Sequence, residues 1–193
     1  CSATCTIEAP PVYVTVGDPT PLSEFGNVDA NAATFAFDCP DHGIGVGLRG
    51  VALNWFGFPT LAQLSLVCAT PTGEQLTTAV GIESNPLFDF QPFALACPAG
   101  SALAAYTMTW NAVGAHSVEL TCRELAGSAV TTLGPVGYGD PADIGGPASV
   151  ACPAGQVIDE IHGKFGSIVG SLGFGCRAVT LARGSTTIRP PRS

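Results

Sequence analysis

Three internal repeats dominate the sequence, and each opens with a Cys-Pro pair and closes with a second cysteine. They run from Cys39 to Cys68, from Cys97 to Cys122 and from Cys152 to Cys176. The flanks match as well, because a glycine and a threonine-rich stretch follow each closing cysteine, as in Gly73 to Thr78. Self-similarity on this scale is typical of a fold built from copies of one supersecondary unit.

Each repeat ends on an alternating strand pattern, such as Leu64-Ser65-Leu66-Val67-Cys68. A period of two places the closing cysteine on the same face as the apolar residues, so its sulfur is expected in the core. Gly and Pro separate the short apolar runs, and no stretch keeps a helical pattern over three turns. We therefore predict an all-β, three-fold fold over residues 31–193, with units at about 31–88, 89–145 and 146–190. Residues 1–30 form a separate N-terminal strand segment.

The eight cysteines predict a disulfide framework and an oxidising compartment, so we expect a secreted, extracellular protein. Each repeat can be closed by its own bridge, although spacing alone does not settle the connectivity. Cys1 and Cys5 then remain, and they bridge either each other or a neighbouring chain. No Cys-x2-Cys motif occurs and the three histidines are dispersed, so we predict no metal and no cofactor.

The charge balance excludes several classes of partner. Only 11% of residues are charged and the formal net charge is −8, whereas an average soluble domain has about 25% charged residues. Nucleic-acid binding and polybasic membrane binding both need clustered Lys and Arg, so neither is expected. No apolar run is long enough to predict membrane insertion. A weakly charged surface favours coverage by neighbouring subunits or by glycans.

The repeat pattern resembles two families of β-prism proteins. The starts Cys97-Pro98-Ala99-Gly100 and Cys152-Pro153-Ala154-Gly155, each followed by an alternating strand that ends in Cys, are similar to the units of vitelline-membrane outer-layer proteins. Those are secreted proteins with three Greek-key sheets. Gly134-Pro135-Val136-Gly137-Tyr138-Gly139 resembles the turn that precedes their units, although the first two units lack it. His42-Gly43 departs from the pattern by one inserted residue.

The third unit also looks like a jacalin-type strand pair, over Gly166 to Gly173. Jacalin-type lectins bind sugars through a Gly-x-x-x-Asp loop near the chain end, and nothing after Cys176 supplies that Asp. The two resemblances cover about residues 30–190. They imply a β-prism-like fold and a structural or glycan-contacting secreted role, and they carry over no specific sugar site.

We find no catalytic constellation and predict that the protein is not an enzyme. Asp38, Asp41 and His42 cluster at the first Cys-Pro turn, where they form either an acid–base site or a polar turn. Asp140 and Asp143 can approach each other across Pro141-Ala142, as a glycosidase pair, a calcium site or a ligand contact.

The other titratable and nucleophilic residues give weaker patterns. Glu160, His162 and Lys164 alternate, so they share one face of a strand, which is typical of a solvated face. Ser117 and Ser171 lie outside any Gly-x-Ser-x-Gly motif, so a hydrolase nucleophile is not indicated.

Aromatic residues are the other candidate for ligand or partner contact. Trp55, Phe56 and Phe58 lie in what reads as a long loop inserted at about residues 54–60, with Trp110 at the equivalent turn of the second unit. They either plug the end of the prism or form an exposed contact for sugar rings or another protein.

The alternating segment Val12-Tyr13-Val14-Thr15-Val16 predicts a strand outside the repeats. It either completes the third sheet beside the last unit or adds to a neighbouring subunit as an assembly strand. Our leading hypothesis is a secreted, non-catalytic, self-assembling subunit of an extracellular coat, matrix or filament, present as a homo-oligomer or polymer. The alternative is a carbohydrate-binding, lectin-like module.

Overall fold

Antiparallel strands form three sheets in the computed structural model, which describes residues 11–26, 32–82, 88–137 and 145–182. Sheet I has the order β6 (Gly73–Leu76), β5 (Phe58–Thr70), β4 (Ile44–Trp55) and β8 (Phe90–Ala96), with β7 (Val80–Gly81) also paired to β5. Sheet II has the order β11 (Val130–Gly137), β10 (Ala115–Glu124), β9 (Ser101–Trp110) and β12 (Gly145–Ala151).

Sheet III has the order β1 (Tyr13–Pro21), β14 (Val169–Leu181), β13 (Gln156–Phe165) and β3 (Ala33–Asp38), with β2 (Phe25–Gly26) paired to β14. A single turn of 3-10 helix, Pro40–His42, follows β3. The all-β, three-fold prediction is confirmed. Among the described residues, no helix is long and apolar enough to cross a membrane.

The three sheets enclose one main hydrophobic core, because their apolar side chains alternate inward as the sequence predicts. The closing cysteines Cys68, Cys122 and Cys176 lie in that core with Leu66, Leu120 and Phe174 beside them. Each closing cysteine is at most 1% exposed, so the period-two interpretation is confirmed.

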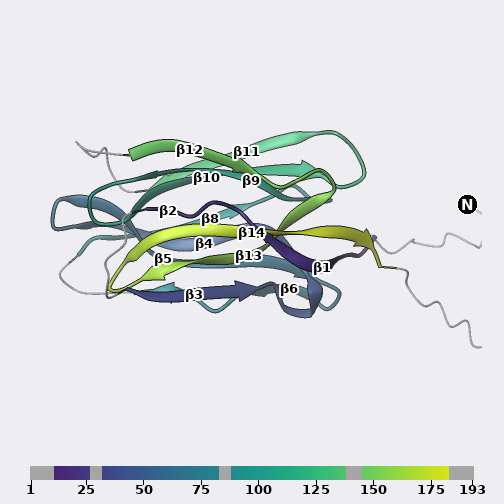
Figure 1. The fold of residues 1–193 in the computed structure, drawn as a ribbon, viewed down its shortest axis with the longest axis horizontal. Coiled ribbons are helices and arrows are strands. Elements are labelled where there is room, and N and C mark those ends of the chain that lie inside the picture. The colour runs from purple at the N-terminus through teal and green to yellow at the C-terminus, as the bar shows by residue number, and fades with distance from the viewer. Residues whose placement is uncertain (1–10, 27–31, 83–87, 138–144, 183–193) are drawn as a thin grey trace, which may run out of the picture.

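The long hairpins β4–β5, β9–β10 and β13–β14 all turn at one end of the prism (left in Figure 1), which we call the hairpin end. The Cys-Pro turns lie at the other end, which we call the Cys-Pro end.

Each repeat contributes its first strand to the sheet of a different repeat. Thus β3 pairs with β13, β8 pairs with β4 and β12 pairs with β9. The chain then crosses to its own sheet through the Cys-Pro turn. There the Cys39, Cys97 and Cys152 amides donate to the carbonyls of Asp159, Val46 and Ala104 respectively. These three acceptors are the extra residues at bulges in β13, β4 and β9, so the contact repeats with three-fold symmetry.

Three disulfides join the sheets in a ring. Cys39–Cys68 links the end of β3 to β5, Cys97–Cys122 links β8 to β10, and Cys152–Cys176 links β12 to β14. The prediction that each repeat closes its own bridge is confirmed. Because the first strand belongs to a different sheet, every bridge also connects two sheets. Cys1 and Cys5 lie outside the described residues.

The N-terminal strand β1 completes sheet III by pairing with β14, with Tyr13 opposite Leu181 and Val16 opposite Ala178. This is the first of the two roles that the sequence left open. β1 takes the place in sheet III that β6 and β11 take in sheets I and II, and it forms the edge of its sheet.

The predicted loop at residues 54–60 is wrong. Strands β4 and β5 continue to Trp55 and from Phe58, and these two residues pair directly. The extra length of the first repeat therefore extends a hairpin of 12 and 13 residues, whereas β9 and β10 each have 10. Only Phe56 and Gly57 form the turn.

Candidate functional site

The hairpin end carries a cluster of aromatic side chains at the β4–β5 turn. The ring of Trp55 stacks on the ring of Phe88, with centroids 4.8 Å apart and an interplanar angle of 22°. Phe56 meets both rings edge-on, at 5.4 Å from Trp55 and 5.2 Å from Phe88. We call Trp55, Phe56 and Phe88 the aromatic platform.

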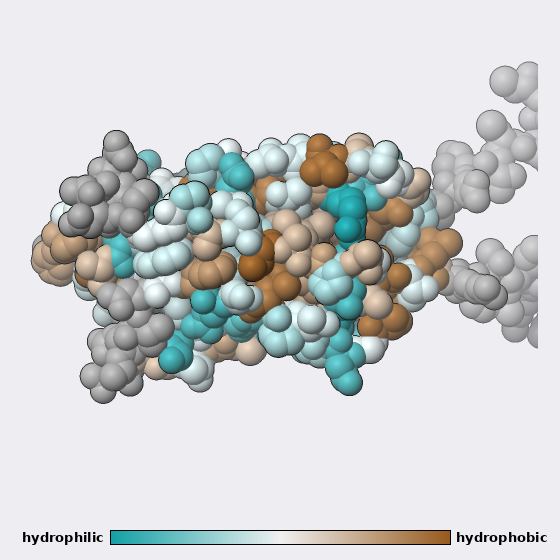
Figure 2. Space-filling model, turned by 45° about the horizontal axis from the view of Figure 1, so that its top comes forward, coloured by the Kyte–Doolittle hydropathy of each residue, from teal (hydrophilic) through white to brown (hydrophobic). Residues whose placement is uncertain are grey.

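Phe56 is the most exposed large hydrophobic residue in the described part of the chain, at 76% of its surface, and Phe58 is 39% exposed. Figure 2 shows apolar surface at this end of the molecule, on its left. The Phe56 ring therefore leaves most of its surface open to a ligand, although it packs against both neighbours. Exposed apolar surface of this kind marks a contact site for a ligand or another protein.

The turn holds Phe56 in an unfavourable backbone conformation. Phe56 has a φ of 49° and Gly57 a φ of 92°, the left-handed values of a two-residue type I′ hairpin turn. Such turns favour Asn, Asp or Gly, and a bulky residue in this region costs about 1 to 2 kcal/mol. Strained residues cluster at functional sites, so the choice of Phe at this position supports a role in contact.

Hydrogen bonds hold the platform hairpin to the neighbouring hairpin. The Asn54 side chain accepts a hydrogen bond from the Gly57 amide at 2.7 Å. The buried Asn111 amide donates to the Pro59 carbonyl, and the Thr60 hydroxyl donates to the Ala115 carbonyl at 2.8 Å. These bonds tie β5 to the β9–β10 turn, so the platform is preorganised.

Trp110 has a different environment from Trp55, although the sequence pairs them as contact residues. Its ring lies parallel to Phe25, with centroids 5.6 Å apart and planes 5° apart. Gly145 lies against the ring, since a Cβ placed there would come within 2.3 Å of Trp110 Cε2. Both neighbours pack on Trp110, as expected for a residue that closes the end of the prism.

A polar cleft of about 450 Å³ opens at the Cys-Pro end, beside sheet III. Asp38, Asp41 and His42 line it together with Arg177, so the structure gathers the residues of the first Cys-Pro turn as the sequence suggested. Asp38 pairs with Arg177 at 3.0 Å, and Asp41 accepts a hydrogen bond from the Gln75 amide at 3.3 Å. The carboxylates are held by these partners, which favours the polar-turn interpretation over an acid–base site.

Asp159 is a buried carboxyl group that the sequence pattern did not single out. Its side chain is fully buried and contacts the Arg177 guanidinium, with 2.8 Å between Oδ2 and Nη1. Burial raises the pKa of Asp159 to about 6, although the Arg177 charge opposes the rise. Aligning the repeats would have found it, because Asp159 stands at the bulge where the other units have Val46 and Ala104.

The remaining titratable candidates lie in separate places. Glu160 and His162 form a pair at 2.9 Å on sheet III, and the hydrogen bond from His162 lowers the pKa of Glu160. Both side chains are only 14% exposed, so this is not the solvated face that the sequence suggested. The Ser171 hydroxyl donates to the Glu24 carboxylate.

On sheet II, Thr109 lies 2.8 Å from His116 Nδ1 and 2.7 Å from the Ser117 hydroxyl. Asp140 and Asp143 lie outside the described residues. In the part of the chain that is described, no group of three or more His, Cys, Asp or Glu side chains is arranged to hold a metal ion.

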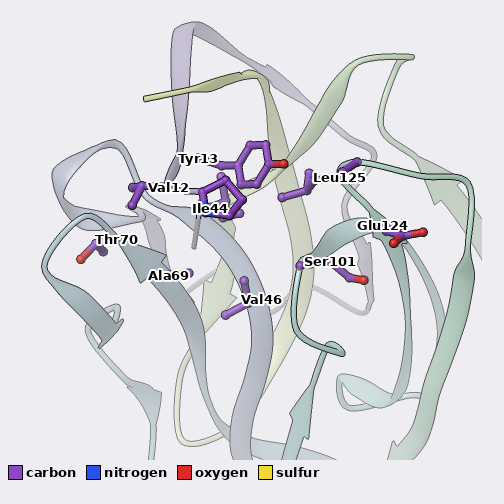
Figure 3. A pocket seen from close by; sticks show the side chains of 12 residues that line it. Val12, Tyr13, Ile44, Val46, Ala69, Thr70, Ser101, Glu124 and Leu125 are labelled. Atoms are coloured by element: carbon purple, nitrogen blue, oxygen red, sulfur yellow. The ribbon is translucent and has the colours of Figure 1, made fainter. Parts of the chain in front are cut away.

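An apolar pocket of about 290 Å³ lies at the Cys-Pro end, where all three sheets approach one another (Figure 3). Tyr13 of β1 covers it, Ile44 and Val46 of β4 form one wall, and Leu125 closes the opposite wall. Thr70 and Ser101 also line it, and the Thr70 hydroxyl donates to the Gly73 carbonyl at 2.8 Å.

Several solved structures with the same fold are plant lectins. Calystegia sepium agglutinin is 19% identical with a TM-score of 0.61, and the match covers 84% of this chain and 99% of that one. The wild-type Malaysian banana lectin is 13% identical with a TM-score of 0.57, covering 83% and 99% of the two chains. A mannose-binding jacalin-related lectin from Ananas comosus is 18% identical with a TM-score of 0.54, covering 83% and 98%.

The chain has the jacalin-like β-prism fold. At these identities the likeness concerns the fold alone, and no family model or curated protein matches the sequence. The jacalin-like part of the resemblance is thus supported, whereas the comparisons do not confirm a vitelline-membrane outer-layer protein.

Proposed function

We propose that this β-prism protein is a non-catalytic, secreted carbohydrate-binding module that contacts sugars through the aromatic platform. The observation that carries the proposal is the exposed Phe56 ring, held at the tip of a hairpin in a backbone conformation that disfavours it. Pyranose rings have apolar C–H faces that pack against aromatic rings, and the exposed surface of Phe56 suits such contact.

The fold neighbours support the same proposal. One of them, Calsepa lectin, is described in complex with a biantennary N-glycan, and the Ananas comosus lectin is described as mannose-binding. The present chain would use aromatic contact and the polar groups around it, such as the exposed Asn54 side chain, because nothing after Cys176 supplies the Asp of the jacalin-type sugar loop. The proposal therefore favours the lectin-like hypothesis over the structural one.

A glycan array probed with the labelled protein tests the proposal. We expect hits that are lost in Trp55→Ala and in Phe56→Asn, and retained in Val130→Asn. Val130 is a matched control because it is 63% exposed and lies at the start of β11, at the opposite end of the prism. A blank array for the folded wild-type protein at high density would overturn the proposal, as would equal binding by Phe56→Asn.

Self-assembly through β1 is a second candidate function. β1 uses one edge to pair with β14, and among the described strands none pairs with its other edge. Val16 on this strand is 46% exposed. An unpaired, partly apolar edge can accept a strand from another copy, which would give the oligomer or polymer expected of a coat, matrix or filament subunit.

A further inference from the structure

The apolar pocket at the Cys-Pro end is remote from the aromatic platform, and we infer that it is a second binding site. Its ligand class is a small, uncharged and mainly apolar molecule, of the size of one or two fused rings. The inference is independent of the proposed sugar contact, because it rests on different residues at the other end of the prism.

Comparison of the three repeats explains why the pocket exists. Ala69, Arg123 and Arg177 each follow a closing cysteine, and they pair with Ile44, Ala102 and Val157 respectively. They are therefore equivalent positions of the three-fold fold. Two of these positions carry an arginine, and the one that lines the pocket, position 69, carries an alanine.

Arg123 shows where a longer side chain at this position can reach, whereas Arg177 pairs with Asp159 and Asp38. Arg123 reaches from sheet II to the next repeat, where its guanidinium donates to the Gln156 carbonyl at 2.6 Å. Ser101 is the residue of the second repeat equivalent to Gln156, and both Ala69 and Ser101 line the pocket. An arginine at position 69 would extend across this same space, so the short side chain of Ala69 leaves the pocket open.

The chemistry of the lining selects the ligand. The buried residues Ile44, Ala102 and Val157 form a small second core, and Tyr13, Val46 and Leu125 pack against it around the pocket. Glu124 is the charged residue of the lining, and its carboxylate accepts a hydrogen bond from the Ala129 amide at 3.4 Å. It points away from the pocket in Figure 3. Walls that are mainly apolar, with few polar groups, favour an apolar ligand of matching size.

The size of the pocket restricts the occupant to a small molecule. A volume of about 290 Å³ is at the lower end of the range for ligand sites, and it is too small for a strand or a second copy of the chain. All three sheets contribute walls, so the pocket is preformed, and binding needs little ordering of the protein.

Titration with the uncharged fluorescent probe N-phenyl-1-naphthylamine tests the inference. We expect saturable, one-to-one enhancement of fluorescence with the wild-type protein. Ala69→Arg should weaken binding by more than about tenfold, because the side chain fills the pocket. Ala69→Leu fills the pocket without adding charge and should weaken probe binding similarly. The test therefore still works if one of the two variants fails to fold.

Ala36→Arg is the matched control, since Ala36 is exposed on β3 and the substitution adds the same charge away from the pocket. It should bind the probe like the wild type. The inference is overturned if the wild-type protein shows no saturable binding, or if folded Ala69→Arg or Ala69→Leu binds the probe as tightly as the wild type. Glycan-array binding should be the same in all four proteins, which separates this test from that of the platform.

Discussion

The Oδ2 atom of Asp159 lies 2.8 Å from Nη1 of Arg177, on neighbouring strands β13 and β14 of sheet III. Nη2 of the same guanidinium lies 3.0 Å from Oδ1 of Asp38 at the end of β3. Burial disfavours the charge of Arg177, yet Asp159 and Asp38 raise its pKa above the ordinary value. One cation thus holds three strands together, and among the described residues the other two repeats have no ion pair at the equivalent positions, Ala69 and Arg123.

Asp159→Asn should remove a pH dependence of stability. The pKa of Asp159 is about 6 in the folded protein, against about 3.9 in an unfolded chain. Between these values the folded state holds a proton that the unfolded state has lost, so this group stabilises the fold more as the pH falls from about 6 to about 4. We expect the unfolding free energy of the wild type, minus that of Asp159→Asn, to increase as the pH falls from about 6 to about 4.

Urea unfolding at a series of pH values measures this difference. Asp18→Asn is the control, because Asp18 is exposed on β1 and its substitution should leave the slope unchanged. A difference that stays constant from pH 4 to pH 7, or that shrinks as the pH falls, would contradict the assignment.

Phe56→Asn should stabilise the protein while it removes sugar contact. Asn adopts the left-handed conformation more readily than Phe, so the substitution relieves backbone strain of about 1 kcal/mol. We expect a thermal midpoint equal to or higher than that of the wild type. A clear loss of stability would show that Phe56 contributes to packing and would weaken the argument from strain.

Trp110→Ala should destabilise the protein and keep glycan binding, whereas Trp55→Ala should lose glycan binding. Trp110 packs between Phe25 and Gly145, so its removal leaves a cavity that costs about 3 kcal/mol of unfolding free energy. Glycan binding by the folded fraction should persist. Chemical denaturation and array binding measured on the same sample separate the two effects. A Trp110→Ala protein that keeps its stability but no longer binds glycans would contradict this assignment.

Removing one disulfide should destabilise the protein without unfolding it. The Cys97–Cys122 bridge closes a loop with a sequence separation of 25, for which loop-closure entropy predicts roughly 3 kcal/mol. We expect the double variant Cys97→Ala, Cys122→Ala to unfold at lower urea with the strand content of the wild type. Loss of strand content in native buffer would mean that this bridge is needed for the fold itself.

Assembly through β1 predicts concentration-dependent oligomers in sedimentation velocity. Val16→Lys should abolish them, because a lysine on an edge strand opposes the addition of another strand. A wild-type protein that sediments as a monomer at every concentration would remove the second candidate function.

The repeats made the core and the disulfides predictable from sequence. Alternation determines which face of a strand is buried, so the pattern alone places Leu66 and Cys68 in the core, where they lie. The exchange of first strands between repeats could not be predicted, because the pattern of β3 specifies a strand and not its partner in sheet III. That choice depends on packing between residues far apart in the chain.

The candidate site was only partly predictable for a similar reason. Trp55 and Phe56 stood out as aromatics, but the extra length of the first repeat predicted an inserted loop, and the sequence does not show that these residues lengthen a hairpin instead. The sequence of the third repeat alone does not show that Asp159 is the extra residue at a bulge, where its carboxyl group is buried beside Arg177. At both Phe56 and Asp159, contacts with residues far away in the chain determine the structure more than the local sequence does.

The pairing of β1 with β14 brings the two described ends of the chain together. The Ala182 amide donates to the Val12 carbonyl at 2.7 Å, at the end of the prism opposite the aromatic platform. A partner that binds the prism at Val12 or Ala182 would therefore leave the aromatic platform uncovered.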